Sequence, residues 1–495
     1  MERGAIVSFL AAGAVLVLLA QTLPYFTNRW VEDESWYSIG GHTLLKEGVI
    51  RNPTFAGRGL ESVVDLKPPG LAISLAGAFS LLGTSATSAR LVSLLLATLA
   101  VVVTFRLARE FVGTAWSGVA AFLLVVDSFF FLAARTVRPE AGVAFFGSLS
   151  VLLFLRSERL APRTQLLSLL SGLSMGVALA FHPGLLGVAL VLGVCGLFWR
   201  KRGRVAHQLA FAAGAGLILA PLVAIAMWTP LHRQAFQAMY MTRAAAPFLD
   251  KLVAESTRWA DFIGVSSARF GTPIPLPLRL HIAATIACAL AVLWRIDRPT
   301  AKRFLWLIAG MLVWWLYMVN KSPRYFAMLA PLTAVALATA SERAIRAWPR
   351  ARTTVLAVVG VCFVSQLAGN VYFLHRARLA DYSSVGRELR TAIPSGSRTW
   401  GAITFWMALH ERPYYSWNRT PLDFAIRELK PEYLIINDRV MMRGEGLGRD
   451  DWAETRLAAQ AFSRDHGDRV AVVDSSFYGS LEVIRVRYDA DGNPR

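Results

Sequence analysis

Long uncharged stretches recur along this chain and alternate with short basic segments. The stretches 5–19, 91–104, 115–126 and 209–227 contain no Lys, Arg or Glu. A helix needs roughly 20 mostly apolar residues to cross the hydrocarbon core of a bilayer. The pattern therefore predicts a polytopic α-helical membrane protein with about 11 transmembrane helices. The predicted spans are 5–26, 89–108, 114–133, 140–155, 164–181, 184–199, 207–228, 280–295, 303–319, 324–340 and 353–373.

The short basic segments set the expected orientation of these spans. With a cytoplasmic N-terminus, seventeen Lys and Arg residues fall in the inner loops 106–113, 156–163, 200–206, 295–303 and 341–352. The short outer loops hold only Arg135, Arg138, Lys321 and Arg324. Lys and Arg are enriched in cytoplasmic loops. The asymmetry predicts that 27–88, 134–139, 182–183, 229–279, 320–323 and everything after residue 374 lie outside.

Two of the outer segments are expected to form juxtamembrane helices. The segment 68–83 is apolar but short, and it opens with two prolines. Counting it as a crossing would put the later basic loops outside, so we predict a helix at the outer interface. The large outer loop 229–279 mixes aromatic residues with Arg and Lys, which is typical of amphipathic helices lying on a membrane.

The chain becomes mixed and charged from about Arg376 onward. Short β-like runs at 399–405, 433–436, 470–473 and 481–486 alternate with helix-like stretches at 384–393 and 452–463. This alternation predicts a small α/β domain. The expected organisation is a transmembrane domain over 1–375, which includes the outer loops 27–88 and 229–279, and an extracytoplasmic α/β domain over 376–495.

Composition excludes two other classes of protein. The chain is 55% hydrophobic and 17% charged, with a net charge of +19. A basic balance alone would suit nucleic acid, but these basic residues lie in short loops between apolar stretches. Cys195, Cys288 and Cys362 all fall within apolar stretches, so neither a disulfide framework nor a thiolate metal site is predicted.

Carboxylates at the predicted outer face are the first candidates for chemistry. Glu32, Asp33 and Glu34 stand beside Trp36 and Tyr37 just after the first span. They suit a solvated loop with interfacial aromatics, or a general base for a hydroxyl nucleophile, or a metal site. Glu140 opens a later span; its alternatives are a role facing Asp33 and a structural ion pair with an arginine.

Cations on the same face are the candidates for binding a phosphate. They are Lys67, Arg135, Arg138, Lys321 and Arg324. Lys67 precedes two prolines that fix its backbone, and the paired arginines suit bidentate binding. Snorkelling, ion pairing and interfacial anchoring are the structural alternatives. His182 stands in a turn, where capping a helix end is the alternative to a functional role.

In their order along the chain, these motifs resemble those of the GT-C superfamily glycosyltransferases, in the branch of aminoarabinose transferases and protein O-mannosyltransferases. The resemblance covers roughly residues 1–340, and Glu140 stands where the branch often has Asp. The residues that carry it are Asp33-Glu34-Ser35-Trp36-Tyr37, Gly40-Gly41-His42, Leu44-Leu45-Lys46-Glu47-Gly48, Lys67-Pro68-Pro69, Ala89-Arg90-Leu91, Arg135, Arg138-Pro139-Glu140, His182-Pro183 and Pro323-Arg324-Tyr325-Phe326 with Pro331.

The resemblance implies a GT-C-like catalytic membrane domain that transfers a hexose or pentose with inversion. The donor would be a polyprenyl-phosphate sugar, and the acceptor a lipid or cell-envelope glycan such as lipopolysaccharide. Transfer would occur at the outer face of a bacterial plasma or inner membrane. Asp33 would deprotonate or orient the acceptor hydroxyl, while Glu34 and Glu140 would position substrate or, as the alternative, a divalent cation. The donor phosphate would be bound by Lys67, Arg135, Arg138, Lys321, Arg324 and Tyr325. Tyr37 and His182 would also position substrate.

No cofactor is expected to be required, and the spacing of His, Asp and Glu gives no support to a divalent cation. Three alternatives stay open. A protein O-mannosyltransferase would use a polypeptide acceptor. A flippase or transporter of the lipid-linked sugar would carry charged residues in mid-span. A membrane anchor for the C-terminal domain would tolerate substitution of Asp33 and Lys67. Membrane lipids are the expected surroundings, and nucleic acid is not an expected partner.

Overall fold

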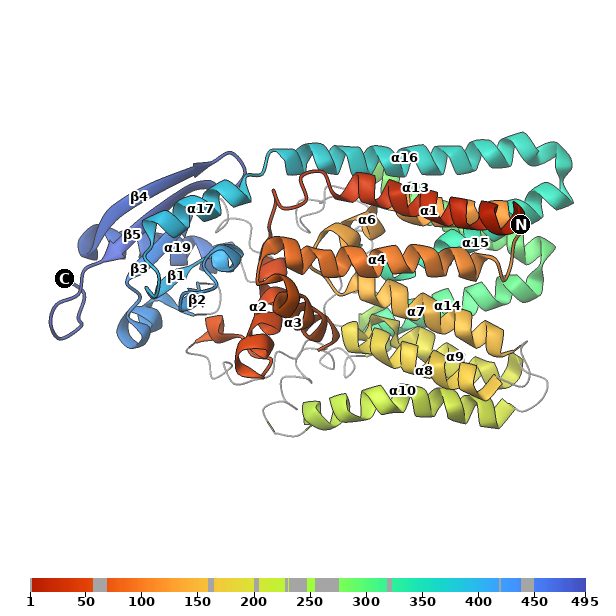
Figure 1. Cartoon of the computed structure of the whole chain (residues 1–495), viewed down its shortest axis with the longest axis horizontal. Coiled ribbons are helices and arrows are strands. Elements are labelled where there is room, and N and C mark those ends of the chain that lie inside the picture. Colours follow the sequence, from red (N-terminus) through yellow and green to blue (C-terminus); the bar gives the residue numbers. More distant parts are fainter. Residues whose placement is uncertain are drawn as a thin grey trace. The chain divides into compact units, whose positions relative to one another are not determined.

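The structure is a computed structural model in which the chain forms two compact units (Figure 1). It describes residues 2–56, 69–158, 164–199, 204–227, 230, 247–253, 276–317, 323–417, 420–437 and 449–495. Unit 1 comprises Met1–Pro24, Leu66–Leu71 and Arg90–Tyr372. Unit 2 comprises Tyr25–Asp65, Ala72–Ala89 and Phe373–Arg495. Most of the predicted outer-loop helices in 229–279 lie outside the described residues.

Unit 1 is built from apolar helices, and each of the predicted spans overlaps one of them. These helices are α1 (Glu2–Thr22), α4 (Ala86–Ala108), α5 (Thr114–Val126), α6 (Ser128–Arg135), α7 (Glu140–Ser157), α8 (Thr164–Phe181), α9 (Leu186–Trp199), α10 (Arg204–Met227), α13 (Leu276–Ile296), α14 (Arg298–Tyr317), α15 (Phe326–Ala347) and α16 (Arg352–Arg378). Among the described residues, 5 helices are long and apolar enough to cross a membrane, or up to 6 with a bent pair. The larger count of spans stays a prediction.

The predicted span 114–133 is formed by a bent pair of helices and not by one straight helix. Helix α5 ends at Val126, and α6 starts at Ser128 with a bend of 64° between them. The Asp127 carboxylate accepts hydrogen bonds from the backbone N–H groups of Phe129 and Phe130, at 3.0 and 2.8 Å. Asp is a favoured N-cap residue. Its side chain replaces the helical partners of these N–H groups, and a new helix axis begins there.

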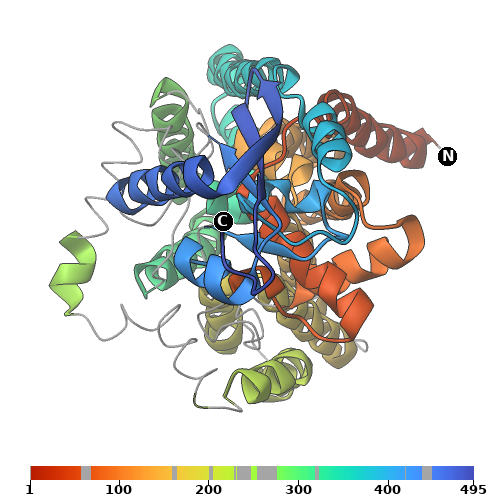
Figure 2. The ribbon, with the colours of Figure 1, turned by 90° about the vertical axis from the view of Figure 1, so that its left-hand side faces the viewer.

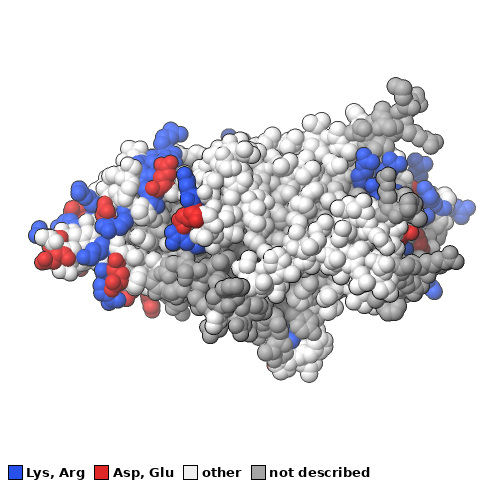
Figure 3. Space-filling model, turned by 60° about the horizontal axis from the view of Figure 1, so that its bottom comes forward, with Lys and Arg blue, Asp and Glu red and all other residues white. Residues whose placement is uncertain are grey.

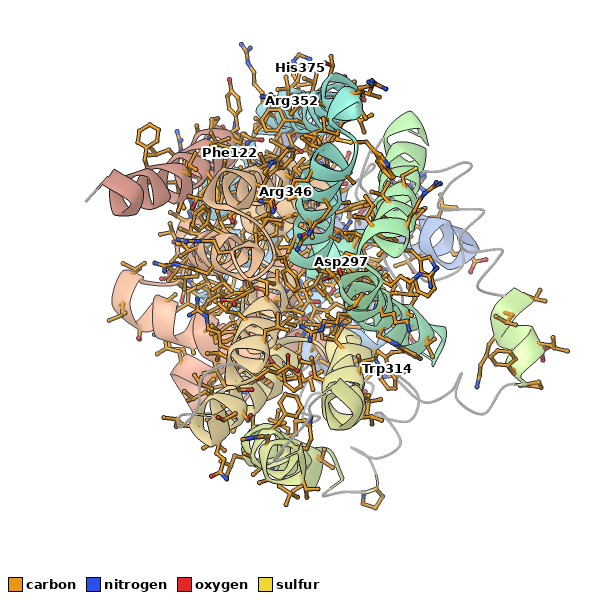
Figure 4. All side chains as sticks on the ribbon, turned by 90° about the vertical axis from the view of Figure 1, so that its right-hand side faces the viewer. Phe122, Asp297, Trp314, Arg346, Arg352 and His375 are labelled. Atoms are coloured by element: carbon orange, nitrogen blue, oxygen red, sulfur yellow. The ribbon has the colours of Figure 1, made fainter. Side chains whose placement is uncertain are left out.

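The surface of unit 1 agrees with the charge pattern of the sequence. On the face shown in Figure 3, uncharged atoms cover the helices and Lys and Arg gather at one end of them. Arg298, Lys302 and Arg350 in the predicted inner loops are exposed. Figure 4 views the helices from the right-hand side of Figure 1 and labels Asp297, Arg346 and Arg352, which belong to the predicted inner loops 295–303 and 341–352. A band without charge beside a basic rim is typical of a membrane protein.

Close helix packing in unit 1 depends on small residues. A Cβ atom added to Gly187 in α9 would lie 1.9 Å from the Gly310 carbonyl oxygen in α14, whereas one added to Gly193 would meet nothing within 4 Å. We expect Gly187→Leu to destabilise the protein by about 1–3 kcal/mol or more, because the backbones must separate. Gly193→Leu, on another side of the same helix where the added side chain meets open space, should change the thermal unfolding midpoint little. Equal midpoints for the two variants would contradict the packing.

Unit 2 contains a five-stranded sheet with the order β2-β1-β3-β5-β4. Strand β1 pairs in parallel with β2 and β3, while β5 pairs antiparallel with β3 and β4. The strands are β1 (Thr399–Gly401), β2 (Tyr414–Ser416), β3 (Tyr433–Asn437), β4 (Gly467–Ser475) and β5 (Gly479–Val486). Helix α17 (Tyr382–Ala392) contacts β4, and α19 (Arg449–His466) packs against β3, β4 and β5 (Figure 2).

These elements match the predicted runs with two corrections. The run 399–405 is a strand only as far as Gly401 and continues as the 3-10 helix η6 (Ile403–Ala408), and strand β2 was not predicted. All residues of η6 are buried. In a segment that is buried on every side, apolar and polar residues do not alternate with a regular period, so its sequence does not distinguish a strand from a helix.

The first outer loop belongs to the same compact unit as the C-terminal residues. Helix α2 (Glu32–Glu47) and most of α3 (Gly70–Leu82) lie in unit 2. The Tyr382 backbone N–H donates to the Asn28 carbonyl at 2.9 Å, and the Thr420 hydroxyl donates to the Thr54 carbonyl at 3.0 Å. In the described part of the chain, residues 25–56 thus pack with the C-terminal residues. The predicted domain boundary between residues 375 and 376 stays a prediction.

Candidate functional site

The acidic motif forms the first turn of α2 in unit 2. The Glu34 carboxylate accepts a hydrogen bond from the Val31 backbone N–H at 3.1 Å and is 1% exposed. It therefore caps the helix start, where negative charge is favoured by the helix dipole. Asp33 in the same turn is half-buried. Of these two adjacent carboxylates, Glu34 thus has a structural role in the helix cap, and Asp33 is the better placed for chemistry.

Tyr37 lies one helical turn after Asp33. Residues four apart lie on the same side of a helix, and both side chains are half-buried. The neighbouring Trp36 packs edge-to-face on Phe55, with ring centroids 5.0 Å apart. The Asp33 carboxylate and the Tyr37 phenol thus lie on the same side of α2, while the adjacent Trp36 indole packs on Phe55.

His42 on the same helix meets a second imidazole. Its Nδ1 lies 3.1 Å from the Thr84 hydroxyl oxygen, and its ring centroid is 5.5 Å from that of His410 and 5.6 Å from that of Trp406. Burial, together with the nearby His410, lowers the pKa of His42 from 6.5 to about 4. Smaller effects come from Lys46, which also lowers this pKa, and from Glu47 and Glu411, which raise it.

This lowered pKa gives unit 2 a pH-dependent stability. Below pH 6.5 the unfolded chain protonates His42, whereas the folded protein keeps it neutral down to about pH 4. The free energy of unfolding therefore has its full value above pH 6.5 and decreases as the pH falls towards 4, because unfolding takes up a proton in this interval. We expect His42→Gln to reduce the fall in thermal unfolding midpoint across this interval. The exposed His375 is the matched control, and an equal reduction in His375→Gln would contradict the assignment.

In unit 1, Arg135 secures the end of α1. It is 2% exposed, and its Nη1 donates hydrogen bonds to the carbonyl oxygens of Thr22 and Pro24 at 2.7 and 2.6 Å. The last carbonyls of a helix lack partners within the helix, and a guanidinium satisfies them well. This contact gives Arg135 a structural role, and its predicted role in binding the donor phosphate stays a prediction.

Arg138 and Glu140 form a buried ion pair at the start of α7. Arg138 Nη2 lies 2.9 Å from Glu140 Oε1, and its Nε lies 3.0 and 3.2 Å from the two carboxylate oxygens. The side chains are 7% and 0% exposed. This is the structural alternative foreseen for the motif, and the two charges neutralise each other. Roles of either residue in binding substrate stay predictions.

His182 and Tyr325 lie together in unit 1. The His182 Nδ1 accepts a hydrogen bond from the Gly184 backbone N–H at 3.0 Å and so caps the 3-10 helix η2 (Pro183–Leu185). The ring centroids of His182 and Tyr325 are 4.6 Å apart. Tyr325 and the half-buried Arg324 belong to a second 3-10 helix, η4 (Pro323–Tyr325). The structure thus joins the His-Pro motif to the Pro-Arg-Tyr motif.

Two glycines bring further motifs to the same place. A Cβ atom on Gly70, just after the Lys-Pro-Pro motif, would lie 2.7 Å from the Ala180 carbonyl oxygen. A Cβ atom on Gly142, two residues after Glu140, would lie 2.4 Å from the Phe181 ring. The starts of α3 and α7 therefore pack on the end of α8, beside His182. Three motifs that are far apart in sequence meet in unit 1, together with Gly70, which follows the Lys-Pro-Pro motif. Lys67 and Lys321 lie outside the described residues.

Two further residues, Arg90 in unit 1 and His410 in unit 2, were not predicted as site residues. Arg90 on α4 is 1% exposed. A cation at the start of the apolar span 89–108 was the feature of the sequence that could have indicated it as a candidate. His410 follows η6 and became a candidate only through its contact with His42. Within the described part of the chain, no group of three or more His, Cys, Asp or Glu side chains is arranged to hold a metal ion.

Comparison with known proteins agrees with this arrangement. Residues 66–228 match the family described as dolichyl-phosphate-mannose-protein mannosyltransferase. An uncharacterized protein of Aquifex aeolicus is 30% identical over 146 residues, which is 28% of this chain and 28% of that protein. The chain thus matches little more than a quarter of the length of this relative.

Two solved structures have a similar fold over nearly the whole chain. ArnT from Cupriavidus metallidurans, bound to undecaprenyl phosphate, has a TM-score of 0.64 at 14% identity, covering 99% of each chain. AglB from Archaeoglobus fulgidus, an oligosaccharyltransferase in complex with an inhibitory peptide and a dolichol-phosphate, has a TM-score of 0.56 at 13% identity. That match covers 96% of this chain and 74% of AglB. Both structures share the fold of this chain, and the family match over 66–228 agrees with the resemblance seen in the sequence.

Proposed function

We propose that this multi-pass membrane protein is an inverting glycosyltransferase. It moves a hexose or pentose from a polyprenyl-phosphate donor to a lipid or cell-envelope glycan acceptor, at the non-cytoplasmic face of a bacterial plasma or inner membrane. The packing of three motifs and of Gly70, at the start of α3, around Phe181 and His182 carries this proposal. The family match over 66–228 and the lipid phosphates bound by ArnT and AglB support it.

The residues of these motifs would have different roles in the transfer reaction. As the bond between the sugar and the donor phosphate breaks, Lys67, Arg324 and Tyr325 stabilise the charge that develops on the leaving phosphate. Asp33 takes the proton from the acceptor hydroxyl, which attacks the opposite face of the sugar and inverts its configuration. Glu34 holds the first turn of α2 through its cap, and the Arg138–Glu140 pair stabilises the start of α7.

A protein O-mannosyltransferase is the second candidate, because the matching family is described by that activity. It differs only in the acceptor, which would be a polypeptide hydroxyl. A flippase of the lipid-linked sugar is the alternative of another class. It would move the donor across the membrane and leave the bond between sugar and phosphate intact.

One product distinguishes a transferase from a flippase or a passive anchor. The protein, reconstituted in proteoliposomes, is incubated with a total membrane lipid extract as the source of donor and acceptor, and polyprenyl monophosphate is measured by mass spectrometry. A transferase releases it, whereas a flippase or a passive anchor does not. Comparing the lipids, glycans and proteins of a strain that lacks the protein with those of its parent then identifies the sugar and its acceptor.

A further inference from the structure

A tyrosine of the C-terminal region holds the backbone just before α2. The Tyr478 hydroxyl accepts a hydrogen bond from the Trp30 backbone N–H at 2.8 Å and donates one to the Trp30 carbonyl oxygen at 2.9 Å. Tyr478 is 2% exposed and Trp30 is 0% exposed. Because Trp30 lies two residues before α2, one side chain satisfies both backbone groups at the entry to the acidic turn.

A second chain of contacts reaches the first turn itself. The Trp30 indole Nε1 donates to the Ser35 hydroxyl oxygen at 2.8 Å, and the Ser35 hydroxyl donates to the Thr404 carbonyl oxygen at 3.3 Å. The Tyr382 hydroxyl donates to the same carbonyl at 2.9 Å, and the Tyr382 ring stacks on Trp30 with centroids 5.9 Å apart. Trp30, before Asp33, thus packs on α17, and Ser35, after it, is hydrogen-bonded to η6.

The remainder of α2 is also fixed. A Cβ atom on Gly41 would lie 2.5 Å from Leu75 Cβ in α3. On the other side, His42 packs against Trp406 of η6. A helix that is held at its start and along its length carries its side chains in fixed positions. The position of the Asp33 carboxylate therefore depends on residues more than three hundred positions later in the chain.

We infer that Tyr478 is a positioning residue for Asp33, and that the C-terminal residues of unit 2 serve transfer by orienting the acidic turn. The inference rests on the proposed function, in which Asp33 accepts the proton. Removing the Tyr478 hydroxyl leaves its ring in contact with Phe405 and Tyr382, whose centroids are 5.8 and 5.9 Å away. It removes the two hydrogen bonds that Tyr478 makes to the Trp30 N–H and carbonyl, so the backbone before Asp33 is held less firmly.

Tyr478→Phe tests this directly. We expect the maximal rate of polyprenyl monophosphate release from the lipid extract to fall by about tenfold to hundredfold, since small misplacements of a reacting group have effects of this size. The extract concentration for half-maximal rate should change by less than about twofold, because donor binding is untouched. Hydrogen exchange of residues 31–41 should accelerate, while that of β3 and β5 should not.

The matched control is Tyr488→Phe. The Tyr488 hydroxyl donates to the Pro431 carbonyl oxygen at 3.1 Å in the same unit, and Pro431 belongs to the segment before β3 and not to α2, so this variant should keep the wild-type rate. A Tyr478→Phe protein with the wild-type rate and wild-type exchange overturns the inference, and so does an equal loss of rate in Tyr488→Phe. If Tyr478→Phe fails to fold, Ser35→Ala tests the same chain of contacts, and unchanged rate and exchange there overturn the inference.

A double variant separates this inference from the proposed function. In an Asp33→Asn background, Tyr478→Phe should lower the residual rate no further, because its effect passes through Asp33. Additive losses overturn the inference. An Asp33→Asn protein with the wild-type rate would refute the proposed role of Asp33 itself. An inactive Asp33→Asn protein together with a fully active Tyr478→Phe protein would refute the inference alone.

Discussion

Asp33→Asn is expected to lower the maximal rate of sugar transfer by about 10²–10⁴-fold, the usual contribution of a general base. Asn has almost the same size as Asp but cannot take the proton from an acceptor hydroxyl. Its cost to folding should be small, about 0.3–1 kcal/mol, from the lost attraction between a carboxylate and the start of α2. The measurement is release of polyprenyl monophosphate by the reconstituted protein, with its thermal unfolding midpoint as the check on folding.

Glu32→Gln is the matched control, because Glu32 opens the same helical turn and is also half-buried. It removes one negative charge from the helix start and leaves Asp33 in place, so transfer should continue. An equal loss in both variants would assign the effect to the electrostatics of the turn, and full activity in Asp33→Asn would refute the catalytic assignment.

The sequence predicted the positions of the membrane helices well, because length and lack of charge are properties of each segment alone. It predicted the 114–133 stretch as one span, because hydropathy averages over Asp127. The bend depends on the Asp127 carboxylate, which accepts hydrogen bonds from two backbone N–H groups in place of the carbonyl oxygens of the preceding helical turn. A polar N-cap residue inside an apolar stretch was the available signal.

The site was predictable as a set of motifs but not as a set of contacts. Spacing indicated both an ion pair and a substrate role for Glu140, and only the distances to Arg138 show that the pair forms. The approaches of Gly70 and Gly142 to α8 depend on how helices pack, which a single sequence does not display. The bond between Trp30 and Tyr478 joins residues 448 positions apart, beyond any local pattern.

Breaking the buried Arg138–Glu140 pair is expected to have the largest effect on stability. Glu140→Gln or Arg138→Met leaves one charge buried without its partner, which costs about 3–5 kcal/mol. Replacing both residues, as Arg138→Met with Glu140→Leu, removes both charges and should recover most of this loss. The measurement is the free energy of unfolding in mixed micelles for the two single variants and the double variant.

The Arg427–Glu428 pair is the control, because its N–O distance of 2.9 Å equals that of the buried pair while its side chains are 70% and 52% exposed. Arg427→Met should cost only about 0–1 kcal/mol, since water screens an exposed pair. Similar losses for the two arginines would show that burial does not set the energy of the Arg138 pair. If the double variant is stable yet inactive in polyprenyl monophosphate release, the pair also acts on substrate; if it is stable and active, the pair serves only to hold α7 in place.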